Sequence, residues 1–168
     1  EFSLMEKAAV SYYPSYVEEE AIHAIHPEYK IKAITAYVYE KFLENIDKDF
    51  AKREGLLFVG GFAHPPNADA VLWFAKEIFP LIRQRIDVNF YVVGSKVTDE
   101  IKALEQPGSG IIVKGFVTEE ELASLYSTSR IVVVPLRYGA GVKGKVVEAV
   151  YNGAAIVTTS IGSEGIPE

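Results

Sequence analysis

PLRYGAGVKGKVVEAVYNGAAIVTT, which occupies residues 135–159, combines a strand–helix–strand pattern with a concentration of positive charge. An apolar run ends at Val134, and a glycine-rich turn follows it. The pattern predicts a helix that begins near Gly141 to Lys143 and a second apolar strand from Ala155 to Val157. Apolar strands joined by a helix are typical of a parallel sheet that is covered on both faces.

Three cations, Arg137, Lys143 and Lys145, lie around the predicted start of this helix. The unpaired N–H groups of a helix N-terminus carry partial positive charge and normally favour Asp or Glu. An anion bound there would make the arrangement favourable. The sequence therefore predicts a phosphate held by backbone N–H groups and these three side chains. Ordinary solvated surface residues are the alternative.

The same strand–helix alternation extends over the whole chain from Leu56. Five apolar strands are predicted, at Leu56–Val59, Val88–Val93, Gly110–Val113, Ile131–Val134 and Ala155–Val157. Four helices are predicted between them, at Asn67–Arg85, Val97–Glu105, Thr118–Ser127 and Gly141–Asn152. This alternation predicts an α/β fold with a Rossmann-like, doubly wound parallel sheet and right-handed crossovers.

The first 54 residues have a different pattern. A short strand at Ala8–Tyr13, a helix from the N-cap Ser15 to about His26 and a strand at Lys30–Tyr39 form a β-α-β piece that is too small to be a domain. Residues 40–54 are charged and are predicted to be a linker. We expect residues 1–54 to be a remnant of a neighbouring domain with its linker, residues 55–168 to be the main domain, and the native protein to continue beyond Glu168.

Glycines follow the carboxyl ends of all five predicted strands of the main domain. In open α/β sheets ligands bind at this edge, and a glycine lets the backbone come close to them. No loop matches the Walker A motif, which argues against an ordinary P-loop site. The glycines are Gly60, Gly61, Gly94, Gly115, Gly139, Gly141 and Gly162.

Composition excludes several classes of function. The net charge of −6 argues against nonspecific nucleic-acid binding, and the absence of cysteine removes disulfides and thiolate chemistry. No apolar run is long enough for a membrane span and no signal peptide is visible. No cluster of Asp, Glu and His has metal-ligand spacing, so we expect no metal. We expect the chain to be cytoplasmic.

Glu148 is the carboxylate nearest to the cationic turn in sequence. On a helical wheel it shares a face with Gly141, Gly144 and Lys145, so its carboxylate is expected to look back towards the turn. It could form an i, i+3 pair with Lys145 on a solvated face. It could instead accept hydrogen bonds from sugar hydroxyls.

The loop after the first main-domain strand carries polar residues with structural explanations. Asn67 is predicted to be the N-cap of the following helix, and Asp69 to lie in its first turn. A lone histidine on a loop, His64, is more often structural or solvated than catalytic.

From Gly55 to Glu168 the chain resembles the C-terminal, donor-binding half of a GT-B glycosyltransferase, and within that class family 4, also called group 1. The resemblance is carried by a succession of segments rather than by one motif. These are LLFVGGF, VKGFV, EEELASLYSTSRIVVVPL and GAGVKGKVVEAVYNGAAIVTTSIGSEGI.

The resemblance implies roles for residues around the glycine turn. In the family the helix carries two glutamates, of which the second contacts ribose hydroxyls and matches Glu148. The first, which contacts the transferred sugar, matches Ala140 and is absent. The family also places an Arg and a Lys on the loop after the first strand, where this chain has Gly61 and, near the lysine, Pro66 and Asn67.

The resemblance further implies that Arg137, Lys143 and Lys145 help to hold the diphosphate, that Phe116 and Val117 border the nucleobase, and that the Gly162–Gly165 loop approaches the sugar or phosphates. The catalytic residue remains unassigned. The implied donor-binding residues are Gly60, Gly61, Phe116, Val117, Arg137, Gly141, Lys143, Lys145, Glu148, Gly162, Ser163 and Glu164.

The implied reaction is transfer of a sugar from a nucleotide-diphosphate donor with retention of configuration, with no metal or other cofactor. The partners would be the nucleotide sugar and an acceptor glycan, lipid or protein bound through an N-terminal acceptor-side domain, of which residues 1–54 would be the end. The full-length protein could act at the inner membrane face, and this fragment is expected to be inactive alone. A nucleotide-sugar epimerase of GT-B architecture and a noncatalytic phospholigand-binding module are the alternatives.

Overall fold

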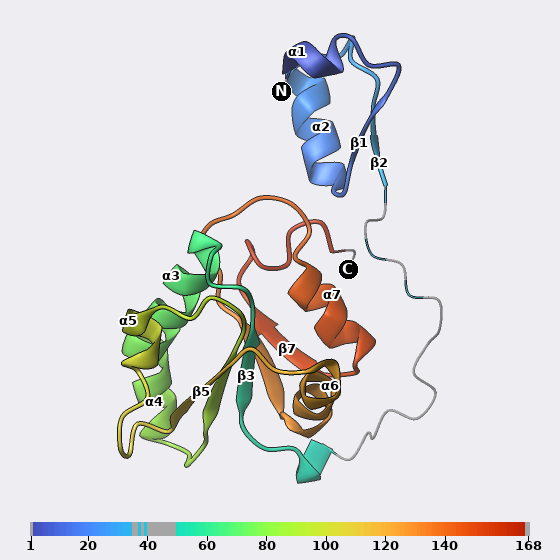
Figure 1. Cartoon of the computed structure of the whole chain (residues 1–168). Helices are drawn as coiled ribbons and strands as arrows, with labels where there is room; N and C mark the ends of the chain where they lie inside the picture. Colours follow the sequence, from blue (N-terminus) through green and yellow to red (C-terminus); the bar gives the residue numbers. More distant parts are fainter. Residues whose placement is uncertain (1, 35–36, 38, 40–49, 167–168) are drawn as a thin grey trace.

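The computed structural model describes residues 2–34, 37, 39 and 50–166, and its main feature is a five-stranded parallel sheet (Figure 1). The strand order is β5-β4-β3-β6-β7, and every neighbouring pair is parallel. The strands are Leu56–Val59 (β3), Phe90–Val93 (β4), Ile111–Gly115 (β5), Ile131–Val134 (β6) and Ala155–Thr158 (β7). The predicted Rossmann-like α/β fold is confirmed.

Helices cover both faces of this sheet. In Figure 1, α3, α4 and α5 lie on one side of the sheet, and α6 and α7 lie on the other. This arrangement follows from a winding direction that reverses after β5. The helices are α3 (Pro65–Trp73), α4 (Phe79–Arg83), α5 (Asp99–Lys102), α6 (Glu119–Thr128) and α7 (Gly144–Tyr151).

The core lies along the central strands, where apolar residues are buried on both faces. Leu57 and Phe58 of β3, Phe90 of β4, and Val132 and Val134 of β6 have no exposed surface. This double burial explains why these strands are apolar throughout instead of alternating with polar residues.

The helix predicted from Asn67 to Arg85 is divided into three segments. A π-helical turn, Phe74–Ile78, separates α3 from α4, and the N–H of Phe79 donates to the carbonyl of Phe74. Pro80 has no N–H to donate to the carbonyl four residues before it. A wider turn just before Pro80 is consistent with that loss.

The start of α3 also differs from the prediction. Pro65 and Pro66 occupy the first two helical positions, where a missing N–H has no cost, and His64 is the N-cap residue. The prediction of Asn67 as N-cap was wrong. Asn67 is instead buried at the third helical position.

The helix α7 begins three residues later than Gly141. Gly139 and Gly141 have φ angles of 128° and 76°, which lie outside the helical region. Lys143 is extended and forms the N-cap, so the turn between β6 and α7 is longer than predicted.

Residues 2–34 form a small separate unit with its own two-stranded parallel sheet. It consists of α1 (Phe2–Met5), β1 (Ser11–Tyr13), α2 (Tyr16–Ile25) and β2 (Ile31–Ala33), and Ser15 caps α2 as predicted. The strand predicted from Lys30 ends at Ala33, and its predicted continuation falls partly on residues 35, 36 and 38, outside the described residues. Most of the predicted linker, residues 40–49, also lies outside them. A 3₁₀ turn, Phe50–Lys52, precedes β3, and the predicted division at residue 54 stays a prediction.

The pairing of β3 with β6 is the feature that opens the ligand edge. β3 pairs with β4 over four residues, but with β6 only through Leu56 with Ile131 and Leu57 with Val132. Each strand continues for two more residues, and the loops that follow then lead to α3 on one face of the sheet and to α7 on the other. This is the topological switch point, where open α/β sheets bind ligands.

Gly94 is predicted to be essential for this edge. A β-carbon at Gly94, whose φ is 156°, would lie 1.9 Å from the carbonyl oxygen of Gly60. We expect Gly94→Ala to lower the free energy of unfolding by about 2 to 5 kcal/mol, from strain and collision together. Gly108→Ala is the control, because Gly108 has a φ of 78° and no atom within 4 Å of the added carbon. It should cost only about 1 to 2 kcal/mol. If urea denaturation shows equal losses of unfolding free energy for the two variants, the predicted collision at Gly94 is contradicted.

Candidate functional site

A cavity of about 210 Å³ lies over the switch point between β3 and β6. Its walls come from the start of α3 with its N-cap, the loop after β6 and the start of α7. We call it the lysine cavity. Its lining residues are His64, Pro66, Asn67, Leu136, Tyr138, Gly139, Ala140, Val142, Lys143, Gly144 and Lys145.

Lys143 combines a buried side chain with an unusual role as helix cap. Its side chain is only 9% exposed, and its Nζ donates to the carbonyl of Gly141 and lies 3.4 Å from Oε2 of Glu164. The ammonium of a lysine cannot accept hydrogen bonds, and the Lys143 side chain makes no capping hydrogen bond to α7. The first N–H groups of α7, at Gly144 and Lys145, are therefore left for another acceptor.

Lys145 carries the most strongly perturbed charge in the cavity. Its Nζ donates to Oδ1 of Asn67 and lies 4.7 Å from the ring centroid of the buried Phe58. Within the described part of the chain, no carboxylate oxygen lies within ion-pair distance of this ammonium. Burial, and after it the nearby charge of Lys143, lowers the pKa of Lys145 to about 8. Among the described residues this ammonium has no counter-ion.

Gly60 provides the space that this ammonium occupies. A β-carbon at Gly60 would lie 2.7 Å from Lys145 Nζ and 2.9 Å from Asn67 Nδ2. The absence of a side chain at Gly60 thus allows the Lys145 ammonium to come close to the backbone after β3. Gly61 adds a backbone carbonyl that accepts from Asn67 Nδ2 at 2.8 Å.

Arg137 does not line the lysine cavity. Its Nε donates to Oδ2 of Asp69 at 2.9 Å, its Nη2 donates to Oδ1, and its guanidinium lies 5.4 Å from the ring of Trp73. The guanidinium lowers the pKa of Asp69 through these hydrogen bonds, and the carboxylate raises the pKa of Arg137. The predicted third phosphate ligand is therefore held by α3 in this structure.

Glu148 faces α6 rather than the glycine turn, which corrects the expected orientation. Its Oε2 accepts a hydrogen bond from the hydroxyl of Tyr126 at 3.2 Å. Burial and the carboxylate together raise the pKa of Tyr126, so its hydroxyl stays protonated and donates. Lys145, three residues earlier, bonds Asn67 and not Glu148.

A second cavity, of about 340 Å³, surrounds Glu148 on the other side of α7. It shares no lining residue with the lysine cavity. Its lining residues are Tyr39, Glu119, Leu122, Ala123, Tyr126, Glu148, Tyr151 and Asn152.

The other predicted site residues lie on loops at the same edge of the sheet. Phe116 is 82% exposed after β5, whereas Val117 packs against the core. Gly162 has a structural reason to be glycine, because a β-carbon would lie 2.0 Å from Oγ1 of Thr158. Ser163 donates to backbone carbonyls of its own turn, and only Glu164 of this loop reaches a cavity cation, Lys143.

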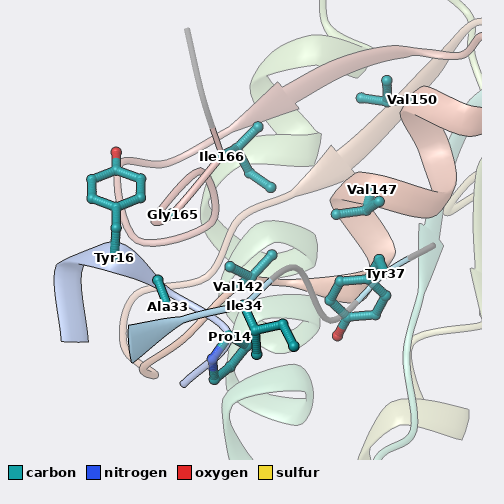
Figure 2. Close-up of a pocket in the computed structure, with 10 residues that line it drawn as sticks. All are labelled: Pro14, Tyr16, Ala33, Ile34, Tyr37, Val142, Val147, Val150, Gly165 and Ile166. Carbon is teal, nitrogen blue, oxygen red and sulfur yellow. The ribbon is translucent and has the colours of Figure 1, made fainter. Parts of the chain in front are cut away.

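A third, apolar cavity of about 360 Å³ adjoins the lysine cavity, and Val142 lines both. Figure 2 shows side chains from the N-terminal unit, from α7 and from the loop after β7 around it. Its lining residues are Pro14, Tyr16, Ala33, Ile34, Tyr37, Val142, Val147, Val150, Gly165 and Ile166.

Asn67 and Tyr126 are polar partners that the sequence did not reveal. Each bonds a predicted site residue, Lys145 or Glu148, but Asn67 is 78 positions from Lys145 and Tyr126 is 22 positions from Glu148. A local sequence pattern cannot predict these pairs, because only the folding of the sheet brings their members together. The weak signal for Asn67 was a polar residue directly after two prolines at the ligand edge.

Among the described residues, no three His, Asp or Glu side chains are grouped so that they could hold a metal ion. None of the helices formed by those residues has the length and apolar character that crossing a membrane requires.

A protein-family model described as "Glycosyl transferases group 1" matches residues 53–168. The matched segment contains the whole five-stranded sheet and the residues of the lysine cavity.

Among curated proteins, the chain is 30% identical over 142 residues to an "Uncharacterized 44.6 kDa protein in cps region" of Klebsiella pneumoniae. The match covers 80% of this chain and 34% of that protein.

Among solved structures, the fold is similar to TarM of S. aureus, with a TM-score of 0.73 at 14% identity, and to the pneumococcal O-GlcNAc transferase GtfA, with 0.69 at 18%. Each comparison covers 95% of this chain, and 31% of TarM or 32% of GtfA. The chain thus spans about a third of the length of these relatives.

Anion binding in the lysine cavity should depend on pH through Lys145. The pKa of Lys145 is lowered to about 8, so its ammonium is present below that pH and lost above it. We expect the dissociation constant for UDP to rise about threefold between pH 7.5 and 8.5, where neither the phosphates nor the uracil ring of UDP changes its ionisation appreciably. Isothermal titration calorimetry over this range measures it. Lys145→Gln should bind weakly and with little pH dependence, and a wild-type profile in this variant would contradict the assignment.

Proposed function

The chain belongs to the group 1 glycosyltransferases, and on that premise we propose that its lysine cavity binds the diphosphate of a nucleotide-sugar donor. The sugar is then transferred, with retention of anomeric configuration, to an acceptor glycan, lipid or protein. The acceptor would be bound by parts of a longer protein, since the relatives are about three times as long as this chain.

The observation that carries this proposal is the ammonium of Lys145, which has no carboxylate partner among the described residues. A buried charge without a partner is costly for a protein to keep. Lys143 lies beside it, and the first N–H groups of α7 point from a helix end that has no side-chain cap. A diphosphate would satisfy all three at once.

The same groups would assist the chemical step. As the bond between the sugar and the diphosphate breaks, negative charge accumulates on the leaving phosphate oxygens. Two ammonium groups and the positive end of α7 stabilise that charge without reorganisation. We therefore propose transfer that needs no metal ion.

Glu148 and the loop after β5 would bind the nucleoside. Glu148 accepts from Tyr126 through one oxygen, and its carboxylate has further lone pairs for ribose hydroxyls. Phe116 offers an exposed ring beside Val117, and a nucleobase can pack against it.

Arg137 would contribute to donor binding only after its guanidinium exchanges Asp69 for the ligand. In this structure its guanidinium forms a two-point interaction with Asp69, which leaves the lysine cavity to Lys143 and Lys145. We propose that these two lysines form the basic donor site, and that Arg137 joins it when a ligand replaces Asp69.

Titration of this chain with UDP, GDP, UDP-glucose and GDP-mannose, with magnesium and with EDTA, tests the proposal directly. We expect binding that survives EDTA. Lys143→Ala should weaken it by about 1 to 3 kcal/mol, the value of a charged hydrogen bond. Lys102→Ala is the control, because Lys102 is an exposed lysine paired with Asp99 on α5. Unchanged affinity in Lys143→Ala would exclude the phosphate role.

The nucleoside role of Glu148 makes a separate prediction. Glu148→Gln should weaken UDP binding about tenfold, because hydrogen bonds from ribose hydroxyls to a carboxylate are lost. Inorganic pyrophosphate has no ribose, so its affinity should stay within about twofold of wild type. Glu100→Gln, an exposed change on α5, is the control. Equal losses for UDP and pyrophosphate would show that Glu148 acts on the phosphates or on the fold instead.

A further inference from the structure

We propose that Asn67 is a positioning residue of the donor site, which holds the Lys145 ammonium at the β3–β6 switch point and keeps its charge free for the diphosphate. This inference rests on the proposed function of the lysine cavity.

The two ends of the Asn67 amide are used for different purposes. Its Nδ2 donates to the Gly61 carbonyl at 2.8 Å, and its Oδ1 accepts from Lys145 Nζ. A carbonyl only accepts and an ammonium only donates, so the group between them needs one donor and one acceptor. Because the Gly61 carbonyl fixes the amide orientation, the oxygen must face the lysine.

Asn67 and Lys145 approach one another from opposite faces of the sheet. Asn67 lies in the first turn of α3, and Lys145 lies in the first turn of α7. Asn67 is only 7% exposed, and the Phe58 ring and the gap at Gly60 complete the surroundings of the ammonium. A lysine has four flexible side-chain bonds, so holding it in advance lowers the entropy cost of binding a ligand.

The neutral amide of Asn67 leaves the positive charge of Lys145 available, whereas a carboxylate at position 67 would neutralise it. Asp is favoured in the first turn of a helix by the helix dipole, and it would also form an ion pair with Lys145. Such a pair would compete with a bound anion for the same ammonium. Asn67 therefore positions Lys145, although an Asp at position 67 would stabilise the start of α3 more.

The other charged and titratable groups near the Lys145 ammonium either line the same cavity or pair with one another. Lys143 and His64 line the same cavity, and Glu164 pairs with Lys143. Arg137 and Asp69 pair with each other. Asn67 is thus the polar partner through which a substitution can change the surroundings of Lys145 directly.

Two substitutions at Asn67 should change the pH profile in opposite directions. Asn67→Asp supplies a counter-charge that raises the pKa of Lys145, so the pH midpoint of UDP binding should move up. Asn67→Leu removes the one hydrogen-bond acceptor that the described residues offer to Lys145, so the midpoint should move down. Both variants should bind UDP and pyrophosphate about tenfold more weakly than wild type at pH 7.5, because the ammonium is neutralised in one and unplaced in the other.

Thermal unfolding of the same variants separates positioning from a structural role. Asn67→Asp adds an acid to the first turn of α3 and an ion pair with Lys145, but it sets an oxygen against the Gly61 carbonyl, so its melting temperature should stay close to that of wild type. A wild-type dissociation constant and pH midpoint in Asn67→Asp would overturn the inference. If that occurs while Lys143→Ala still weakens UDP binding, the proposed function stands without it. If wild type binds neither UDP nor pyrophosphate, the proposed function and this inference both fail.

Discussion

The structure of the ligand edge depends on how far β3 and β6 remain paired. Pairing stops after Leu57 and Val132, while β3 continues to pair with β4 through Val59. The carboxyl end of β3 therefore leads into α3 on one face, and the end of β6 leads towards α7 on the other. The first turns of these helices meet above the gap, and the side chains that meet there form the lysine cavity.

Keeping the Lys145 ammonium in this gap, without a carboxylate partner among the described residues, has a cost that depends on pH. The folded pKa of Lys145 is about 8, lower than its ordinary value of 10.5. Between these values the unfolded chain binds more protons than the folded protein, so the stability of the unliganded protein rises with pH. Below pH 8 both states are protonated and the full cost of burying the charge remains. An anionic ligand offsets this cost, which couples ligand binding to stability.

Local sequence was sufficient for the strands and for the lysines but not for their partners. The apolar runs such as Ile131–Val134 have one plausible structure in an α/β chain, and Lys143 and Lys145 were conspicuous at a helix start. The bond from Lys145 to Asn67 depends on the packing of two helices against a sheet. The orientation of Glu148 depends likewise on Tyr126 of α6, and neither contact leaves a periodic signal in the chain.

The missing side chain at Gly60 has a consequence for how such sites change during evolution. The Lys145 ammonium occupies the volume that a β-carbon at position 60 would need. A relative that acquires a side chain at position 60 has to shift the ammonium at the end of the lysine side chain, or replace the lysine at position 145. The two positions are therefore expected to covary, although they belong to different strand–helix units and lie 85 residues apart.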